Sequence, residues 1–386
     1  MSSERMRDLP DIPDIAVKYT VFPPGYVNDV RGWSFEKAMV VGNAGRLLTL
    51  DIDFGAKCSL NCPFCFRRGS SVDEQRRELR FRDLVGIVLQ ARALGLRTVK
   101  FLGAGEPLEN PSILEFLQFL KSLDIIPVIF TKTGVIGDDA RVRRLFSYKG
   151  IHTGEELAGE LDDCGASMVV GFNSFKDEVQ QAMCGDGARV LARRNRTLEI
   201  LSRAGFNDPN PTRLALGVNP VTKSNYDEAL EIYKWARLRN IYAIVTPTMI
   251  SGRAKNEVWK SITPSGRELI ELYTEIYRFN LDTGLMTLDQ ILEEGISAYG
   301  GAHPCNQVAA GLYVTLNGVV LSCPGSEDSV EGNVWRSPLS EIWAKSVNFT
   351  RAGTFNCRCI AKDGKSIPAD LYDRVLANIM ASWGGR

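Results

Sequence analysis

Histidine is scarce in this 386-residue chain, which has only His152 and His303 beside nine cysteines. Lysine and arginine (46) balance aspartate and glutamate (46), so net charge does not favour nucleic acid or an anionic membrane surface as a partner. No apolar run is long enough to span a bilayer, and the first residues lack the apolar core of a signal peptide. We therefore expect a cytoplasmic protein without a nucleic-acid or membrane partner, whose reduced cysteines bind metal more often than they form disulfides.

Strand-like and helix-like stretches alternate from residue 47 to about residue 284. Helices are expected at 81–94, 112–123, 188–204 and 226–239. The six expected strands lie in LLTLDID, TVKFLGAGEP, IPVIFTKTG, ASMVVGFNS, TRLALGVNP and IYAIVTPTM. Such alternation is typical of βαβ units with a parallel sheet. Six repeats fall short of a closed eight-fold barrel, so the α/β class and a partial (β/α)6 TIM-like barrel are predicted, with the chemistry at the C-terminal ends of the strands.

The pattern changes after residue 285. GLYVTLNGVVLSC (311–323) alternates apolar and polar residues around Asn317 and Gly318, which predicts a β-hairpin. A short helix is expected at 337–346. We therefore divide the chain into an N-terminal extension (1–46), a barrel (47–284) and a small C-terminal domain of hairpin and helix (285–386). That last domain has four cysteines: Cys305, Cys323, Cys357 and Cys359.

Three cysteines lie together in CSLNCPFC, at positions 58, 62 and 65, directly after the first expected strand. Thiolates on one short loop can turn toward a common metal centre. A structural zinc site usually has four ligands and two-residue gaps, whereas this loop has three cysteines and no histidine nearby. Three protein ligands leave one coordination position open, as a catalytic cluster requires. Buried thiols or a zinc site are the alternative interpretation.

This loop resembles the C-x3-C-x2-C motif of the radical S-adenosylmethionine (SAM) enzymes, including the aromatic Phe64 before the third cysteine. The resemblance implies that Cys58, Cys62 and Cys65 hold a [4Fe–4S] cluster whose fourth iron chelates the amino and carboxylate groups of SAM. One-electron reduction would then give methionine and a 5′-deoxyadenosyl radical that abstracts a substrate hydrogen. Such chemistry belongs to the cofactor, and the protein orients it and excludes water.

Other strand ends carry further parts of the resemblance. AGEP (104–107) is similar to the family's G-G-E-P segment, in which Gly105 permits a close backbone approach and Glu106 accepts from the SAM ammonium. GFNS resembles S-L-D-G, with Asn173 in place of the aspartate. The arginine of the family's I-R-G is missing, since the chain has Met183-Cys184-Gly185 there. The remaining candidates for SAM contacts are Thr131, Asn219 and Arg253, for which helix-capping or exposed structural roles are the alternatives.

The spacing of Cys305, Gly318 and Cys323, C-x12-G-x4-C, resembles the opening of the SPASM and shorter twitch extensions of radical SAM enzymes. With Cys357 and Cys359, the count implies one auxiliary four-cysteine [4Fe–4S] cluster. The C-x-C pair is tighter than the family's C-x2-C, which leaves open whether both sulfurs ligate. A structural zinc site is the alternative for this set.

The predicted function is reductive SAM cleavage followed by oxidation or epimerisation of a small sugar, cyclitol or nucleoside in a biosynthetic pathway. The resemblance also implies an electron donor such as flavodoxin or ferredoxin. Cys184 is a weak candidate for returning a hydrogen atom to a substrate radical, and Cys164 is expected to be a small buried residue.

Modification of a ribosomally made peptide is the enzymatic alternative, although residues 1–46 are short for a winged-helix recognition domain. A zinc-stapled scaffold is the non-enzymatic alternative.

Overall fold

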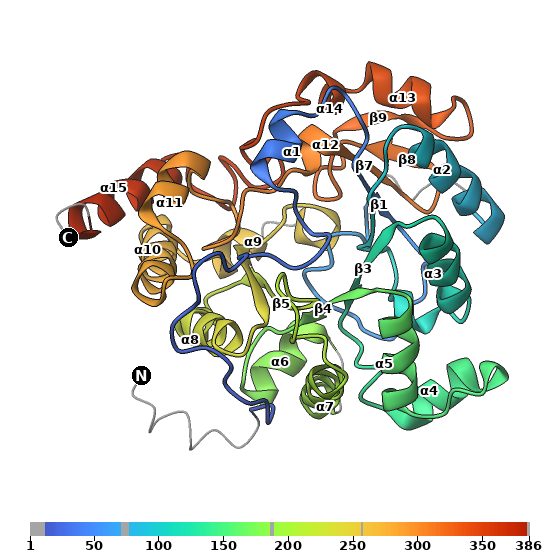
Figure 1. Ribbon diagram of the computed structural model, residues 1–386, viewed down its shortest axis with the longest axis horizontal. Coiled ribbons are helices and arrows are strands. Elements are labelled where there is room, and N and C mark those ends of the chain that lie inside the picture. Colours follow the sequence, from blue (N-terminus) through green and yellow to red (C-terminus); the bar gives the residue numbers. More distant parts are fainter. Residues whose placement is uncertain (1–11, 71–76, 186–188, 256–257, 384–386) are drawn as a thin grey trace.

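The computed structural model describes residues 12–70, 77–185, 189–255 and 258–383 (Figure 1). Six parallel strands pair in chain order: β1 (Thr49–Ile52), β2 (Thr98–Phe101), β3 (Ile126–Thr131), β4 (Ser167–Gly171), β5 (Leu214–Val221) and β6 (Tyr242–Pro247). Each lies in a stretch predicted from the sequence, apart from Val221 at the end of β5, because each is a short, apolar, β-prone run that ends at polar or glycine-rich residues. The predicted partial (β/α)6 barrel is confirmed.

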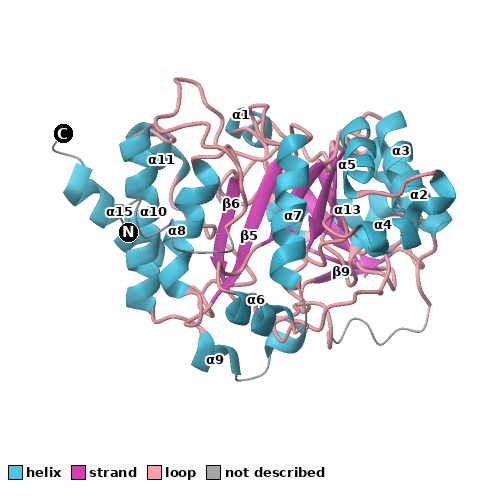
Figure 2. Ribbon diagram, turned by 90° about the horizontal axis from the view of Figure 1, so that it is seen from below, coloured by secondary structure: helices cyan, strands magenta, loops and turns pink. Residues whose placement is uncertain are grey.

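Helices connect the strands and cover the outer face of the sheet (Figure 2). The connecting helices are α2 (Phe81–Ala93), α3 (Ile113–Ser122), α4 (Asp139–Phe146), α5 (Gly154–Asp163), α6 (Asp177–Cys184), α7 (Val190–Arg203) and α8 (Tyr226–Arg237). In α2, Leu84, Ile87, Val88 and Ala91 are buried, as their spacing predicted. Helix α3 begins slightly later than expected, with Ser112 as its N-cap and the Asn110 side chain accepting the Ser112 N–H at 3.1 Å.

The C-terminal region extends the same sheet. Strand β7 (Gly311–Val314) pairs in parallel with β1, and β8 (Val319–Leu321) and β9 (Val330–Asn333) continue it in antiparallel fashion. The predicted hairpin is confirmed, with Gly318 at a φ of +81° in its turn. The remaining helices are α1 (Lys37–Val41), α9 (Val258–Ile262), α10 (Gly266–Thr283), α11 (Leu288–Glu294), α12 (Gln307–Ala310), α13 (Leu339–Lys345), α14 (Val347–Thr350) and α15 (Leu371–Trp383).

Within the N-terminal extension, for which the sequence predicted no structure, residues 12–46 close the N-terminal end of the barrel, and residues 1–11 lie outside the described part. The backbone at Gly32 lies against Ile126 and Thr98, the first residues of β3 and β2. Trp33 reaches into the barrel interior, where its ring centroid lies 5.5 Å from that of Phe130 and 5.8 Å from that of Tyr299. The segment around Val30 and Trp33 is therefore part of the buried core.

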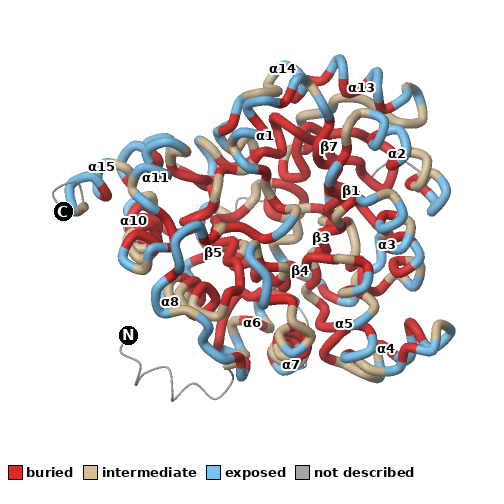
Figure 3. The backbone as a smooth tube through the Cα atoms, in the orientation of Figure 1, coloured by how far each residue is buried: buried red, intermediate tan, exposed pale blue. Residues whose placement is uncertain are grey.

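Burial follows this architecture (Figure 3): the central strands are buried, whereas exposed residues lie mainly on the outer helices and loops. Cys164, at the C-terminal end of α5, is buried as predicted. Among the described helices, none combines the length and apolarity needed to cross a membrane.

Candidate active site

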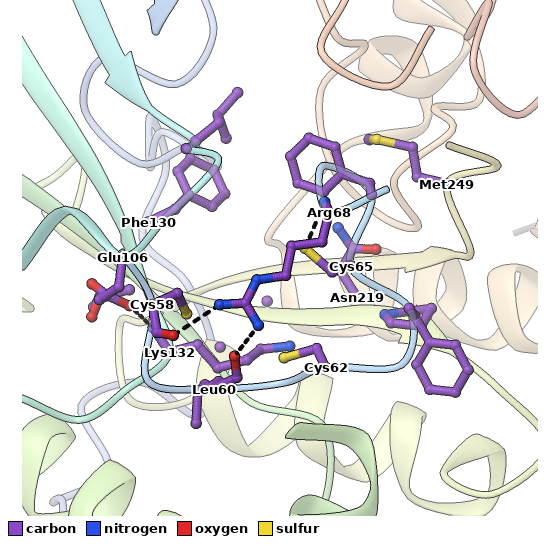
Figure 4. Close-up of a pocket in the computed structure, with 18 of the residues that line it drawn as sticks. Cys58, Leu60, Cys62, Cys65, Arg68, Glu106, Phe130, Lys132, Asn219 and Met249 are labelled. Atoms are coloured by element: carbon purple, nitrogen blue, oxygen red, sulfur yellow. Dashed lines mark hydrogen bonds between the residues drawn. The ribbon is translucent and has the colours of Figure 1, made fainter. Parts of the chain in front are cut away.

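The cysteine loop after β1 opens into a cavity at the C-terminal ends of the barrel strands (Figure 4). Apolar side chains such as Phe130 of β3 and Ile244 of β6 form much of the wall. Most of the residues selected from the sequence line this same cavity: Cys58, Cys62, Phe64, Cys65, Gly105, Glu106, Thr131 and Asn219. They come together because parallel strands end at one edge of the sheet.

Backbone contacts from distant strand ends hold the cysteine loop. A Cβ atom on Gly105 would lie 2.7 Å from the carbonyl oxygen of Gly55. The group that approaches the Gly105 backbone closely is therefore the segment that leads into the cysteine loop. Gly252, which follows β6 and has a φ of +56°, has equally little room, since its Cβ would lie 2.7 Å from the Cys65 carbonyl oxygen. The Arg253 N–H donates to that same oxygen at 3.0 Å.

The sulfur environment suits a cationic metal centre. Burial raises the pKa of Cys58 to about 12, so a thiolate there requires compensating positive charge. The backbone N–H of Arg68 donates to the Cys65 sulfur at 3.3 Å. The Arg68 guanidinium donates to the carbonyl oxygens of Leu60 (2.8 Å) and Cys58 (2.9 Å), which ties the two ends of the loop together (Figure 4).

Glu106 is buried and joins the ends of β2 and β3. Its Oε1 accepts the N–H of Leu108 at 3.2 Å, and its Oε2 accepts the N–H groups of Lys132 (2.9 Å) and Thr133 (3.3 Å). Burial raises the pKa of Glu106, and these backbone hydrogen bonds act in the opposite direction. The Thr131 side chain lowers the Glu106 pKa in the same way, and Glu106 lies in the wall of the cavity.

Lys132 lines the cavity too, and the sequence reasoning missed it. Its side chain extends toward Cys62 (Figure 4). Burial alone would lower the pKa of Lys132, but the nearby sulfurs, led by Cys62 and Cys184, raise it. The available signal was a cation directly after Thr131, at the end of a barrel strand.

Three sequence candidates lie outside the cavity wall. The Arg253 guanidinium donates to Asn61 Oδ1 at 2.6 Å and so braces the back of the cysteine loop. Asn173 is fully buried, and its side-chain amide has no hydrogen-bond partner among the described residues. Cys184, at the end of α6, is fully buried in an apolar cluster with Leu60, Cys58 and Cys62. The structure thus brings Cys184 to the loop but not to the cavity.

Comparison with protein families matches residues 52–263 to the Radical SAM superfamily. The chain belongs to this superfamily. Radical SAM enzymes use a [4Fe–4S] cluster together with SAM, so the chain is an enzyme of this kind, and the scaffold alternative loses its basis. No curated protein matches the chain.

Solved radical SAM structures resemble the fold at low sequence identity. SuiB of Streptococcus suis, bound to its precursor peptide SuiA, is 17% identical with a TM-score of 0.55, over 82% of this chain and 68% of SuiB. The structure of anSMEcpe with bound AdoMet is 15% identical with a TM-score of 0.57, over 88% of this chain and 97% of anSMEcpe. At these identities the likeness establishes the shared fold.

The cavity residues fit the cofactors of a radical SAM enzyme. Three cysteines line one largely apolar cavity, an N–H donates to one of the sulfurs, and a buried thiolate there requires compensating positive charge, which the irons of a cluster would supply. Within the described residues, no three His, Cys, Asp or Glu side chains are arranged around a single metal ion. A four-iron cluster does not require that arrangement, because its irons are spread over a cube.

The C-terminal cysteines of this radical SAM chain form a second group. Burial raises the pKa of Cys323 well above its ordinary value, and nearby Cys359 and Cys305 raise it further. Lys362 lies in the same region and is fully buried. Its ammonium donates to Thr246 Oγ1 at 2.6 Å and lies 4.3 Å from the Tyr299 ring centroid.

Cys357 differs from the other three C-terminal cysteines. Like Cys359, it packs against the apolar cluster that contains Cys323, so the difference lies in its electrostatic surroundings. Burial raises the pKa of Cys357 and Arg351 lowers it, but none of the other three cysteines shifts it. The structure therefore groups Cys305, Cys323 and Cys359, with Cys357 at the margin.

Proposed function

We propose that the chain cleaves SAM reductively and uses the resulting radical to abstract a hydrogen atom from a small-molecule substrate. The observation that carries the proposal is that Cys58, Cys62 and Cys65 line one cavity with Gly105 and Glu106. When bound at these cysteines, a [4Fe–4S] cluster supplies the electron and the open iron position that SAM cleavage needs.

The side chains around the cavity have complementary roles in this proposal. Glu106 accepts a hydrogen bond from the SAM ammonium, and Asn219 and Thr131 offer further polar contacts. Phe64 and Phe130 provide apolar surface that excludes water from a reactive radical. Arg253 and Asn173 remain candidates for SAM contacts on sequence grounds, but they require rearrangement to reach the cavity.

We also propose that the C-terminal region binds an auxiliary [4Fe–4S] cluster, as twitch domains do. Cys305, Cys323 and Cys359 would ligate it, with Cys357 as a candidate fourth ligand. The buried ammonium of Lys362 would offset the negative charge of thiolate ligands. On this proposal, residues 47–284 carry the SAM site and residues 285–386 the auxiliary site, on one continuous sheet.

Met249 relates the two sites. Its side chain lines the SAM cavity and also packs in the apolar cluster that contains Cys323. A substrate in the cavity would therefore lie next to the auxiliary group, which could accept an electron from a substrate radical. This supports oxidation of a small sugar, cyclitol or nucleoside. Epimerisation would need a hydrogen donor at the cavity, and Cys184 is buried away from it.

Peptide modification is the second candidate, since SuiB was solved with its precursor peptide. In the present chain, residues 12–46 close the barrel, with Trp33 inside it, and they form no separate domain within the described part. This use of the extension favours a small molecule. We further propose a cytoplasmic location and a flavodoxin or ferredoxin as the electron donor.

The first experiment measures iron in anaerobically purified protein and 5′-deoxyadenosine formed from SAM under reduction. We expect about eight irons per chain if both sites hold full clusters. Replacement of Cys58, Cys62 and Cys65 by alanine should remove about four irons and abolish 5′-deoxyadenosine. Zinc without iron, or undiminished cleavage by the triple variant, would refute the assignment. Product analysis with candidate sugars, cyclitols, nucleosides and peptides then separates the substrate classes.

A further inference from the structure

Two cationic side chains line the described cavity, and they differ in their bonding. The Arg68 guanidinium is occupied by the backbone oxygens of Leu60 and Cys58 and by Asn61 Oδ1 (3.3 Å). The Lys132 ammonium makes no hydrogen bond or ion pair with any residue in the described part of the chain. Lys132 is therefore the cavity cation that is available to a ligand.

The fold makes specific room for this lysine. Lys132 follows β3, and its aliphatic chain crosses Gly171 at the end of the neighbouring strand β4. A Cβ atom on Gly171 would lie 2.9 Å from Lys132 Cγ and would overlap Cε. Any larger residue at 171 would displace the chain that carries the ammonium. Gly171 thus positions Lys132 along the cavity floor toward Cys62 (Figure 4).

The cavity itself offers no carboxylate to Lys132. The acidic side chain in the cavity wall is Glu106, and its oxygens are used by three backbone N–H groups and make no ion pair with the Lys132 ammonium. The Lys132 side chain is half-buried, and its ammonium lines the cavity without a hydrogen-bond partner in the described part of the chain, so it can form a charge-assisted hydrogen bond with an entering anion. A ligand with a carboxylate close to the cysteine sulfurs satisfies that requirement, and SAM carries one on its methionine portion.

We propose that the Lys132 ammonium binds the carboxylate of SAM and so fixes the methionine portion beside the cysteine loop. This inference rests on the proposed function. Glu106, across the end of β3, is available to the SAM ammonium, so the two side chains would hold the two ends of the amino-acid group with opposite charges. Lys132 is a binding and positioning residue in this assignment.

The test compares two nucleosides that the enzyme cannot cleave. S-adenosylhomocysteine has the amino-acid group, whereas 5′-methylthioadenosine lacks it. Dissociation constants are measured by calorimetry on anaerobically reconstituted wild type, Lys132→Met and Lys132→Arg, after iron has been counted in each. Loss of a charge-assisted hydrogen bond should weaken S-adenosylhomocysteine roughly 10- to 100-fold in Lys132→Met. The 5′-methylthioadenosine affinity and the iron content should stay unchanged, and Lys132→Arg should recover part of the loss.

Lys345→Met, at an exposed lysine of α13, is the matched control and should bind both nucleosides as the wild type does. An unchanged S-adenosylhomocysteine affinity in Lys132→Met would overturn the proposal. So would an equal weakening of both nucleosides, or a loss of iron, because either assigns Lys132 to the fold or to the cluster. If Lys132→Met does not fold, Lys132→Gln replaces it with the same criteria. If the wild type holds iron but binds neither nucleoside, the proposed function and this inference are both overturned. If the wild type binds both nucleosides and only the expected effect of Lys132→Met is missing, the inference about Lys132 fails and the proposed function stands.

Discussion

The backbone of Gly185 lies directly against the carbonyl group of Asn61, and a Cβ atom on Gly185 would overlap that oxygen. Gly185 also ends α6 in the left-handed region, with a φ of +62°. We therefore expect Gly185→Ala to lower the free energy of unfolding by about 2 kcal/mol or more, from backbone strain and displacement of the loop. Urea unfolding measures the stability, and iron content per chain reports on the loop.

Gly159→Ala is the matched control, because Gly159 lies in α5 with open space where the Cβ would be. This change should raise the free energy of unfolding by about 0.5–1 kcal/mol, as alanine is the better helix former. Equal stability and iron content in the two variants would show that the Gly185 contact does not hold the loop.

The fully buried ion pair of Arg67 and Asp53 fastens the end of the cysteine loop to β1, with Nη2 and Oδ2 2.9 Å apart. Asp53 also accepts the N–H of Leu316 at 2.9 Å. Arg67→Met leaves a buried carboxylate uncompensated, so the free energy of unfolding should fall by about 3–5 kcal/mol. The double variant Arg67→Met/Asp53→Asn should recover part of this loss, because the unpaired charge is gone.

Arg203→Met is the control for that experiment. Arg203 pairs with Glu155 at 3.2 Å, but both side chains are exposed, and such pairs contribute about 0–1 kcal/mol. A loss in Arg67→Met no greater than in this control would contradict a stabilising role for the buried pair.

The C-terminal cysteines should differ in their effect on iron content. We expect Cys359→Ser to remove about four irons per chain, since Cys359 lies close enough to Cys305 and Cys323 to shift the Cys323 pKa. Cys357→Ser should retain most of that iron, because Cys357 lies at the margin of the group. Cys164→Ala, at a buried site on α5, is the control and should keep all of it. Equal losses in the Cys357 and Cys359 variants would show that both sulfurs ligate.

Trp33 should contribute strongly to stability although it precedes the barrel in sequence. Its ring packs on Phe130 and Tyr299, and the Lys100 ammonium lies 4.9 Å from its centroid. Trp33→Ala should cost about 3–5 kcal/mol of the free energy of unfolding, measured by urea denaturation. Val17→Ala, at an exposed position of the same extension, should change it by less than about 0.5 kcal/mol. Similar values for both would mean that the extension is not part of the core.

Local sequence patterns were sufficient for the barrel and for the main cysteine loop. The strands around Leu50 and Val128 are short apolar runs with clear ends, and such runs specify strands wherever they are buried on both faces. The positions of Cys58, Cys62 and Cys65 follow from their spacing on one loop. Glu106 and Asn219 reach the same cavity because parallel strands end together.

Contacts between distant segments decided the rest. The sequence shows a lysine at 132, but only the packing of its chain across Gly171 directs the ammonium into the cavity. Arg253 was expected in that cavity, whereas the loop carbonyls and Asn61 hold it outside. Trp33 is buried because its ring packs against Phe130 and Tyr299 in the barrel interior. Sequence spacing thus determined which groups share a loop or a sheet edge, whereas side-chain direction depends on neighbours that only the folded chain brings together.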